Sequence, residues 1–187
     1  TNAVNSPVDL LFELTVQKAT QGITFAAIAD QVTTNAIGLS ATASSALPVS
    51  FSVWSGPAQL SDGTNLTFTG AGVVRVVAAQ GGNGNYAAAP AVTNAFTVTK
   101  SVQASLVFNP ASPQTFGSNQ VLSASGGSGS GAFSYALVDG PGVVQGDQLS
   151  LKSGTGSVHV QATREADVLY YARSVTAEVV CARAIQT

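Results

Sequence analysis

Charged and reactive side chains are scarce in this chain of 187 residues. Asp, Glu, Lys and Arg together make up 9% of the residues, whereas an average soluble domain has about 25%. The chain contains one cysteine, one histidine and no methionine. A lone cysteine excludes a disulfide within the chain, and a lone histidine provides little for a metal site, which needs clustered ligands.

The charge balance excludes several classes of partner. The net charge is −2, so the chain has neither the basic footprint of a nucleic-acid-binding protein nor a polybasic membrane patch. No run of about 18 apolar residues predicts a membrane span, and the N-terminus lacks the basic segment of a signal peptide. We expect this to be a mature chain or a piece of a longer one. The apolar fraction of 45% argues against disorder.

A long stretch of the sequence occurs twice. Residues 49–86 recur as residues 133–170, with a Gly-Pro pair, a Gly-x-Gly turn, a valine-rich run and a tyrosine at the same offset of 84 positions. A constant offset across several landmarks indicates a repeated structural unit.

Three segments alternate apolar and polar residues in the period of a half-buried strand. They lie at residues 12–18, 96–100 and 179–183, and their equivalent positions are Val16, Val98 and Cys181, followed by Lys18, Lys100 and Arg183. The last two segments each close a repeat. We therefore predict that residues 1–19 are the terminal strand of a preceding repeat, followed by domains at 20–101 and 102–187.

Each repeat contains about seven short strand-like runs separated by turn signals, without helical periodicity. This pattern predicts an all-β fold with two tandem immunoglobulin-like β-sandwich domains, preceded by an orphan β-strand. The Gly/Ser run at 125–131 aligns with residues 43–48, so we interpret it as a loop within a domain. The joint at 99–105 is short and poor in glycine, which predicts domains placed end to end with restricted bending.

Four segments of the chain carry a resemblance to a known family. They are LSATASSALPVSFSVWSGPA, LTFTGAGVVRVVAAQGGNGNYAAAP, NPASPQTFGSNQVLSASGGSGSGAFSYALVDGPG and SGTGSVHVQAT. They resemble the tandem immunoglobulin-like repeats of large bacterial surface and secreted proteins. The resemblance covers nearly all of both units. It implies stalk or spacer domains of adhesin-like proteins, or accessory modules beside enzymes. Arg75 departs from the pattern, which usually has a neutral strand residue there.

Few residues are candidates for chemistry. His159 lies in a predicted strand, where a solvent-facing residue is the plainer interpretation than a metal ligand. Glu165 and Asp167 form the closest acidic pair, and a weak calcium site there competes with an ordinary charged loop tip. Cys181 occupies a position filled by valine in the other copies, which favours a small buried apolar residue over a reactive thiol.

No catalytic motif is present. The glycine-rich segments lack the strand–glycine–helix context of a phosphate loop, no acids are flanked by the aromatic residues that a sugar-cleaving site needs, and the serines lack a nucleophile elbow. An internal isopeptide crosslink through Lys18 or Lys100 is a minor alternative to exposed strand-end lysines. We predict no enzyme activity, no cofactor and no metal.

The leading hypothesis is a non-enzymatic structural or spacer segment of an extracellular bacterial surface or filament protein. Its partners are neighbouring immunoglobulin-like repeats or copies of itself, with neither nucleic acid nor membrane insertion. The orphan strand sharpens this hypothesis, because an unpaired strand can add to the sheet of another molecule. The predicted assembly residues are Leu10, Phe12, Leu14 and Val16. A stub that packs on the first domain is the alternative.

The alternative function is a module that binds carbohydrate or another surface ligand through exposed aromatic residues. Trp54 and Tyr171 are the candidate contacts, and surface glycans are the candidate partner. Trp54 lies in a run that also looks like core, as does Tyr135. Tyr171 aligns with Ala87, so it is an addition specific to the second repeat.

Overall fold

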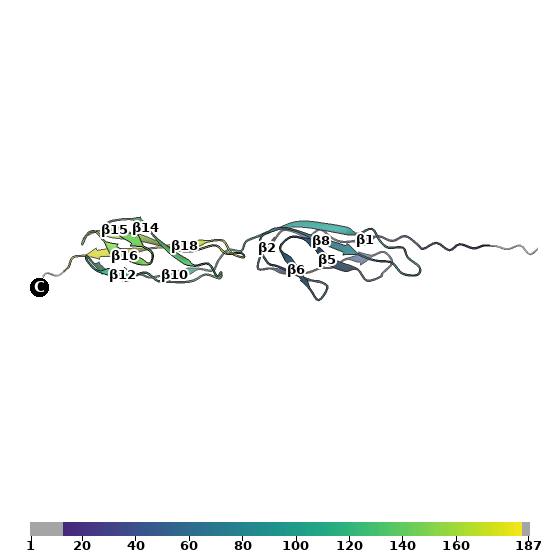
Figure 1. Ribbon diagram of the computed structural model, residues 1–187, viewed down its shortest axis with the longest axis horizontal. Helices are drawn as coiled ribbons and strands as arrows, with labels where there is room; N and C mark the ends of the chain where they lie inside the picture. The colour runs from purple at the N-terminus through teal and green to yellow at the C-terminus, as the bar shows by residue number, and fades with distance from the viewer. Residues whose placement is uncertain (1–12, 185–187) are drawn as a thin grey trace, which may run out of the picture.

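The computed structural model describes residues 13–184, and these residues form β-strands and connecting turns. The sheets fall into two groups, one built from each half of the described chain. Figure 1 shows the two groups end to end along the long axis. The prediction of an all-β fold with two tandem immunoglobulin-like sandwiches is confirmed, while the domain boundaries at 20–101 and 102–187 stay a prediction.

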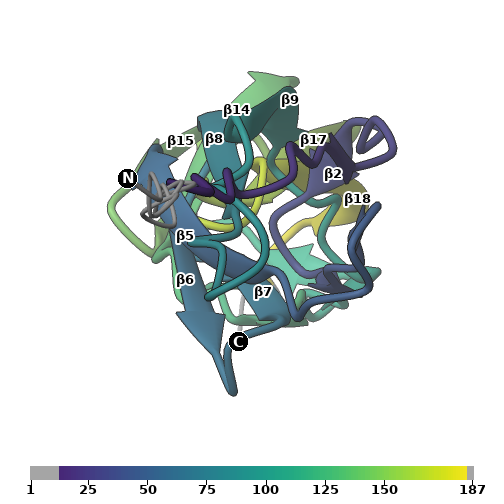
Figure 2. The same cartoon turned by 90° about the vertical axis from the view of Figure 1, so that its right-hand side faces the viewer.

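The first domain has a four-stranded sheet facing a three-stranded sheet, with a two-stranded ribbon beside them. Figure 2 shows the two layers, with β8 and β9 in one and β6 and β7 in the other. The strands are β1 (Ile23–Thr24), β2 (Gln31–Val32), β3 (Ala36–Gly38), β4 (Thr42–Ala43), β5 (Ser50–Ser55), β6 (Ala58–Ser61), β7 (Asn65–Phe68), β8 (Gly72–Ala79) and β9 (Val92–Thr99).

The second domain repeats this order. Its strands are β10 (Leu106–Phe108), β11 (Gln114–Thr115), β12 (Asn119–Val121), β13 (Ala124–Gly126), β14 (Phe133–Asp139), β15 (Gly142–Gln145), β16 (Gln148–Leu151), β17 (Ser157–Arg164) and β18 (Arg173–Ala182). The large sheets have the orders β2-β9-β8-β5 and β11-β18-β17-β14, and in each the short edge strand, β2 or β11, pairs parallel with the last strand of its domain. Gln31 pairs with Val98, and Gln114 pairs with Cys181. The predicted equivalence of Val98 and Cys181 is confirmed.

Each domain closes around its own apolar core, because alternate residues of the central strands face inward. In β8, Val74, Val76 and Ala78 are fully buried, and Phe68 packs edge-on against Phe96 with ring centroids 6.0 Å apart. The second core uses the equivalent positions and adds the buried thiol of Cys181.

The repeated Gly-Pro pairs mark a turn that requires glycine. Gly56 and Gly140 have φ angles of 103° and 94°, which residues with a Cβ rarely adopt. A Cβ on Gly56 would lie 2.3 Å from the carbonyl oxygen of Val73, and one on Gly140 equally close to that of Ser157. Backbone crowding therefore explains why this landmark recurs.

Two details differ from the sequence-based expectation. The run of residues 37–42 reads in the sequence as one strand, whereas the structure has two short ladders there, because β3 pairs with β7 and β4 pairs with β1. Residues 13–18 have no strand partner and run away from the first domain (Figure 1). No helix able to cross a membrane occurs within residues 13–184.

Candidate functional site

The joint between the domains is a backbone-paired segment. Ser101 forms a parallel bridge with Tyr170. The Ser101 N–H donates to the carbonyl of Leu169 at 2.8 Å, and its own carbonyl accepts from the Tyr171 N–H at 3.0 Å. Ser101 lies only two residues after β9, the last strand of the first domain, and its backbone is already bonded to a loop of the second domain. This leaves no freely rotating linker between them.

The same arrangement occurs where the chain enters the first domain. Ala19 forms a parallel bridge with Tyr86. Its N–H donates to the carbonyl of Asn85 at 2.8 Å, and its carbonyl accepts from the Ala87 N–H at 2.9 Å. Ala19 is thus the structural counterpart of Ser101, and the same way of entering a domain occurs twice in the described chain.

Two buried glutamines complete this motif. Gln21 and Gln103 each lie two residues after the bridge and are 8% and 1% exposed. The Nε2 group of Gln21 donates to the Ala87 carbonyl at 2.7 Å, and that of Gln103 donates to the Tyr171 carbonyl at 3.0 Å. Neither glutamine was among the residues predicted from the sequence. Their signal is the spacing, since each follows a lysine by three positions at the close of a strand segment.

Direct contacts also join the domains. The Thr33 hydroxyl at the end of β2 donates to the carbonyl of Leu169 in the second domain. Thr34 Oγ1 lies 2.8 Å from Ser101 Oγ, and the Lys100 ammonium group donates to the carbonyl of Asp167. Thr33 is 3% exposed, so water is excluded from the centre of this contact. Side chains from both sides therefore restrain the joint.

Asp167 organises the loop between β17 and β18, which bonds to the joint. We call this loop, and the corresponding loop between β8 and β9, the receiving loops. Its carboxylate accepts hydrogen bonds from the backbone N–H groups of Ser130, Leu169 and Tyr170. These bonds, the Ser130 N–H first, lower the pKa of Asp167 to about 2. Asn83 has the same role in the first domain, because its side-chain oxygen accepts from the N–H groups of Asn85 and Tyr86 at 2.8 and 2.9 Å.

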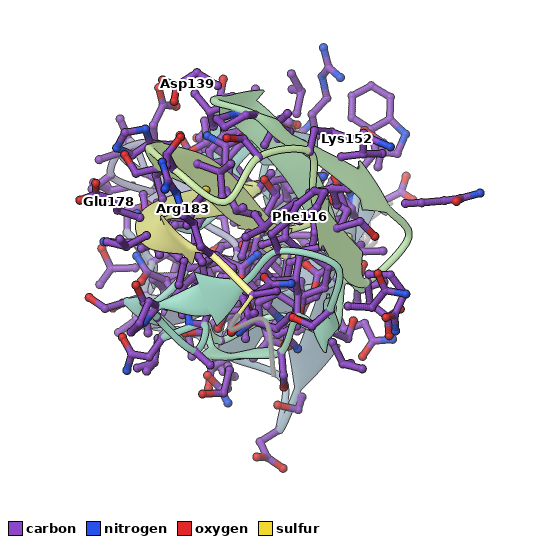
Figure 3. All side chains as sticks on the ribbon, turned by 90° about the vertical axis from the view of Figure 1, so that its left-hand side faces the viewer. Phe116, Asp139, Lys152, Glu178 and Arg183 are labelled. Atoms are coloured by element: carbon purple, nitrogen blue, oxygen red, sulfur yellow. The ribbon has the colours of Figure 1, made fainter. Side chains whose placement is uncertain are left out.

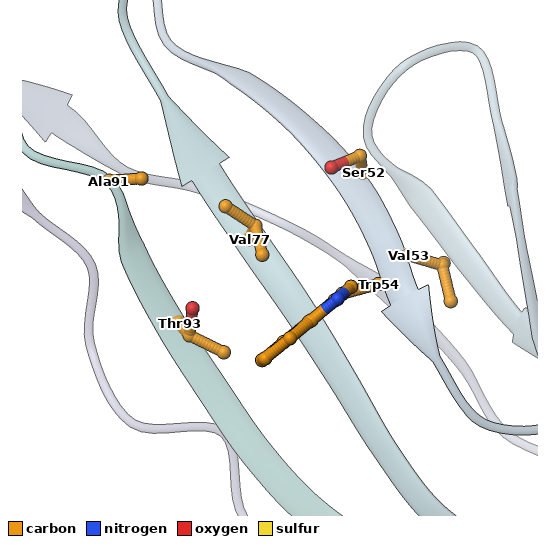
Figure 4. Close-up of a pocket in the computed structure, with 6 residues that line it drawn as sticks. All are labelled: Ser52, Val53, Trp54, Val77, Ala91 and Thr93. Carbon is orange, nitrogen blue, oxygen red and sulfur yellow. The ribbon is translucent and has the colours of Figure 1, made fainter.

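A second feature is an exposed tryptophan on the large sheet of the first domain. The ladder between β5 and β8 shifts register between Val53 and Ser55, so Trp54 sits at a bulge, a feature that re-aims side chains. Its side chain is 69% exposed, so the core-like interpretation of Trp54 was wrong. The indole extends over β8 toward Thr93 (Figure 4). Together with Ser52 and Val77 it lines an open depression of about 440 Å³.

The other sequence candidates lie apart from these two features. Leu14 and Val16 are 86% and 83% exposed, whereas Leu10 and Phe12 lie outside the described residues. Tyr171 is about half exposed and joins the domain joint through its backbone. Tyr135 packs against the second core and accepts a hydrogen bond from the Ala124 N–H through its hydroxyl.

The titratable candidates have ordinary local partners. His159 Nδ1 lies 2.6 Å from Asp139 Oδ1, and this hydrogen bond raises the pKa of His159. The Glu165 carboxylate accepts from the Ser134 hydroxyl, so it has a different partner from that of Asp167. Within residues 13–184, no group of three or more His, Cys, Asp or Glu side chains is placed to hold a metal ion.

Comparisons with known proteins give structural similarity alone. No family model matches the chain, and no curated protein is similar to it in sequence. Mouse cadherin-23 repeats EC22–24 align over 88% of this chain and 67% of theirs, with 16% identity and a TM-score of 0.36. The D00-D0 domain of intimin aligns over 86% of this chain and 98% of its own length, with 11% identity and a TM-score of 0.32. A C-terminal intimin fragment, in complex with the intimin-binding domain of the translocated intimin receptor, aligns over 71% of this chain and 51% of its own length. The identity is 17% and the TM-score is 0.32. This chain thus spans about half of that fragment.

Proposed function

We propose that this chain is a non-enzymatic spacer segment of an extracellular bacterial surface protein, whose two domains act as one stiff unit. The joint carries this proposal. Its bridging residue is backbone-bonded to the second domain, and Thr33 and Lys100 bond across it. A spacer must hold its ends apart, and a joint without free residues serves that purpose. The scarcity of charged side chains, of histidine and of cysteine agrees with a role outside catalysis.

The stiffness is tested by comparing the orientation of the two domains in solution. Residual dipolar couplings from both domains are expected to fit a single alignment tensor. Inserting Gly-Ser-Gly between Thr99 and Lys100 is expected to give two tensors and a shorter maximum dimension in small-angle scattering. The same insertion at the exposed turn Asp62–Gly63 is the control, because it leaves the joint intact. Two independent tensors for the unaltered chain would contradict the proposal.

The proposal includes assembly through the N-terminal segment. Leu14 and Val16 expose apolar side chains in a stretch without a sheet partner, and an unpaired segment of this kind is a template for strand pairing. Deleting residues 1–18 is expected to convert a multimer to a monomer in sedimentation experiments. It keeps the Ala19 bridge, so the first domain stays folded. Replacing Leu14 and Val16 by serine is expected to act in the same direction. Unchanged sedimentation in both variants would rule out strand donation.

Trp54 favours a second candidate function, the binding of a saccharide. The indole is exposed, and Ser52 and Thr93 line the same depression. An aromatic face with nearby hydroxyl groups suits the mixed apolar and polar surface of a sugar ring. A glycan array is expected to show binding that Trp54→Ala abolishes. Val138→Ala, at the equivalent position of the second domain, is the matched control, and Tyr171→Ala tests the other aromatic candidate. Binding that persists in Trp54→Ala would exclude this site.

A further inference from the structure

The end of the second domain that lies away from the joint has the same backbone arrangement as the end of the first domain that forms the joint. At the end of β2, the Thr33 N–H donates to the carbonyl of Thr99 at 2.9 Å. At the end of β11, the Phe116 N–H donates to that of Ala182 at 2.8 Å. Phe116 therefore occupies the place of Thr33. Arg183 follows β18 as Lys100 follows β9.

The two ends differ in what covers them. Thr33 is buried against Leu169 of the following domain. A Cβ on Gly70 of the first domain would lie 3.3 Å from Val168 Cγ1 of the same following domain. The corresponding surface of the second domain is open, since Phe116 is 45% exposed. Figure 3 shows Phe116 and Arg183 together on this end of the molecule.

A four-residue sequence pattern occurs three times, at the entry to the first domain, at the joint and after β18. The chain reads Lys-Ala-Thr-Gln at 18–21, Lys-Ser-Val-Gln at 100–103 and Arg-Ala-Ile-Gln at 183–186. In the first two copies the second residue forms the bridge to a receiving loop, and the glutamine is buried against the same loop. The receiving loops of both described domains are thus already occupied by the first two copies.

We propose that the exposed end of the second domain, formed by Phe116 and Arg183, is a docking surface for another unit of the same immunoglobulin-like kind. The inference rests on the proposed spacer function and continues the interface already seen between the two domains. Arg183 would donate to a loop carbonyl, as Lys100 donates to that of Asp167.

The chemistry of Phe116 selects the kind of unit. Thr33 binds a loop carbonyl through its hydroxyl, but a phenylalanine ring donates no hydrogen bond and gains instead by burying apolar area. The receiving loop of the second domain has Val168 next to its Asp167 turn, whereas the first domain has Gly84 at that position. A unit with a loop of the second kind therefore fits the surface better than one with a loop of the first kind.

Two extended chains test the proposal. One carries a second copy of residues 105–187 after Thr187, and the other carries a second copy of residues 23–100 there. The Phe116 amide is expected to exchange about ten-fold more slowly in the first extension than in the unextended chain, because docking suppresses local opening. The second extension is expected to give a smaller effect. Val168→Gly in the added copy alone is the matched control and is expected to restore fast exchange.

The outcomes separate this inference from the spacer proposal. Equal Phe116 exchange in both extended chains and in the unextended chain would overturn the docking surface, provided that dipolar couplings show the added unit to be folded. An added unit that fails to fold on this end would overturn it as well. Loss of the common alignment between the first two domains would instead contradict the spacer proposal. The exchange rate of the Phe116 amide and the dipolar couplings are measured on the same samples.

Discussion

Gln103 shows how one side chain fixes the entry to a domain. It is almost fully buried, and its amide donates to the carbonyls of Glu165 and Tyr171 while its oxygen accepts from the Gly129 N–H. Gln103→Leu would leave these backbone groups without partners, and an unpaired buried polar group costs about 1–3 kcal/mol. We expect the second domain to lose at least that much stability in urea unfolding. A surface control, Gln145→Leu, is expected to have little effect.

Cys181 lies in the second core at the position of Val98 in the first. Cys181→Val is therefore expected to keep the free energy of unfolding within about 1.5 kcal/mol, as a swap of similar volume does. Cys181→Ser places a hydroxyl in an apolar site and is expected to cost about 1–3 kcal/mol. Denaturant titration distinguishes the two variants. Equal losses in both would show that the thiol has a role beyond packing.

Asp167 makes the second domain sensitive to acid. Its pKa in the folded state, about 2, lies below the ordinary value of 3.8. The stabilisation is therefore present above pH 3.8 and is lost as the pH falls through about 2. Asp167→Asn keeps an oxygen for the Leu169 and Tyr170 N–H groups, as Asn83 does in the first domain. We expect a flatter stability profile between pH 5 and 2 for that variant in thermal melts. An unchanged acid slope would show that other groups cause it.

At the scale of the strand, β8 separates buried from exposed valines by the alternation of its side chains. Val76 is fully buried, whereas Val73 is about half exposed. Val76→Ala is expected to destabilise the first domain by about 2–3 kcal/mol, since it removes two buried methyl groups and leaves a cavity. Val73→Ala is the matched control and is expected to cost less than about 1 kcal/mol. Similar losses in urea unfolding would contradict the inward assignment of Val76.

Alternation and repetition in the sequence predicted these strands well. Val74, Val76 and their counterparts Val158 and Val160 face the cores as their period requires, and the repeated Gly-Pro pairs fell at tight turns. The bulge at Trp54 was missed, because register shifts depend on the partner strand rather than on local sequence. The sequence predicted a short, stiff joint between the domains. It did not predict the hydrogen bond from Thr33 to Leu169, because the two residues are 136 positions apart in the chain.

At the scale of the whole molecule, the domains share a joint but have separate cores. The buried clusters around Leu66 and Leu149 have no member in common. Leu66→Ala is therefore expected to lower the stability of the first domain by about 2–5 kcal/mol. The transition of the second domain is expected to change little, because distant sites act nearly independently. Calorimetry or domain-resolved hydrogen exchange measures both, and equal shifts would indicate one cooperative unit.

The parallel pairing of β2 with β9 and of β11 with β18 has a mechanical consequence. β2 beside β9 and β11 beside β18 each join the entering segment of a domain to its departing strand. Tension along the long axis pulls the two partners in opposite directions along their length, so their hydrogen bonds are loaded together in shear instead of opening one by one. Single-molecule extension is expected to show two high-force ruptures, one for each domain. A chain built this way would stay at full length under load until a domain gave way.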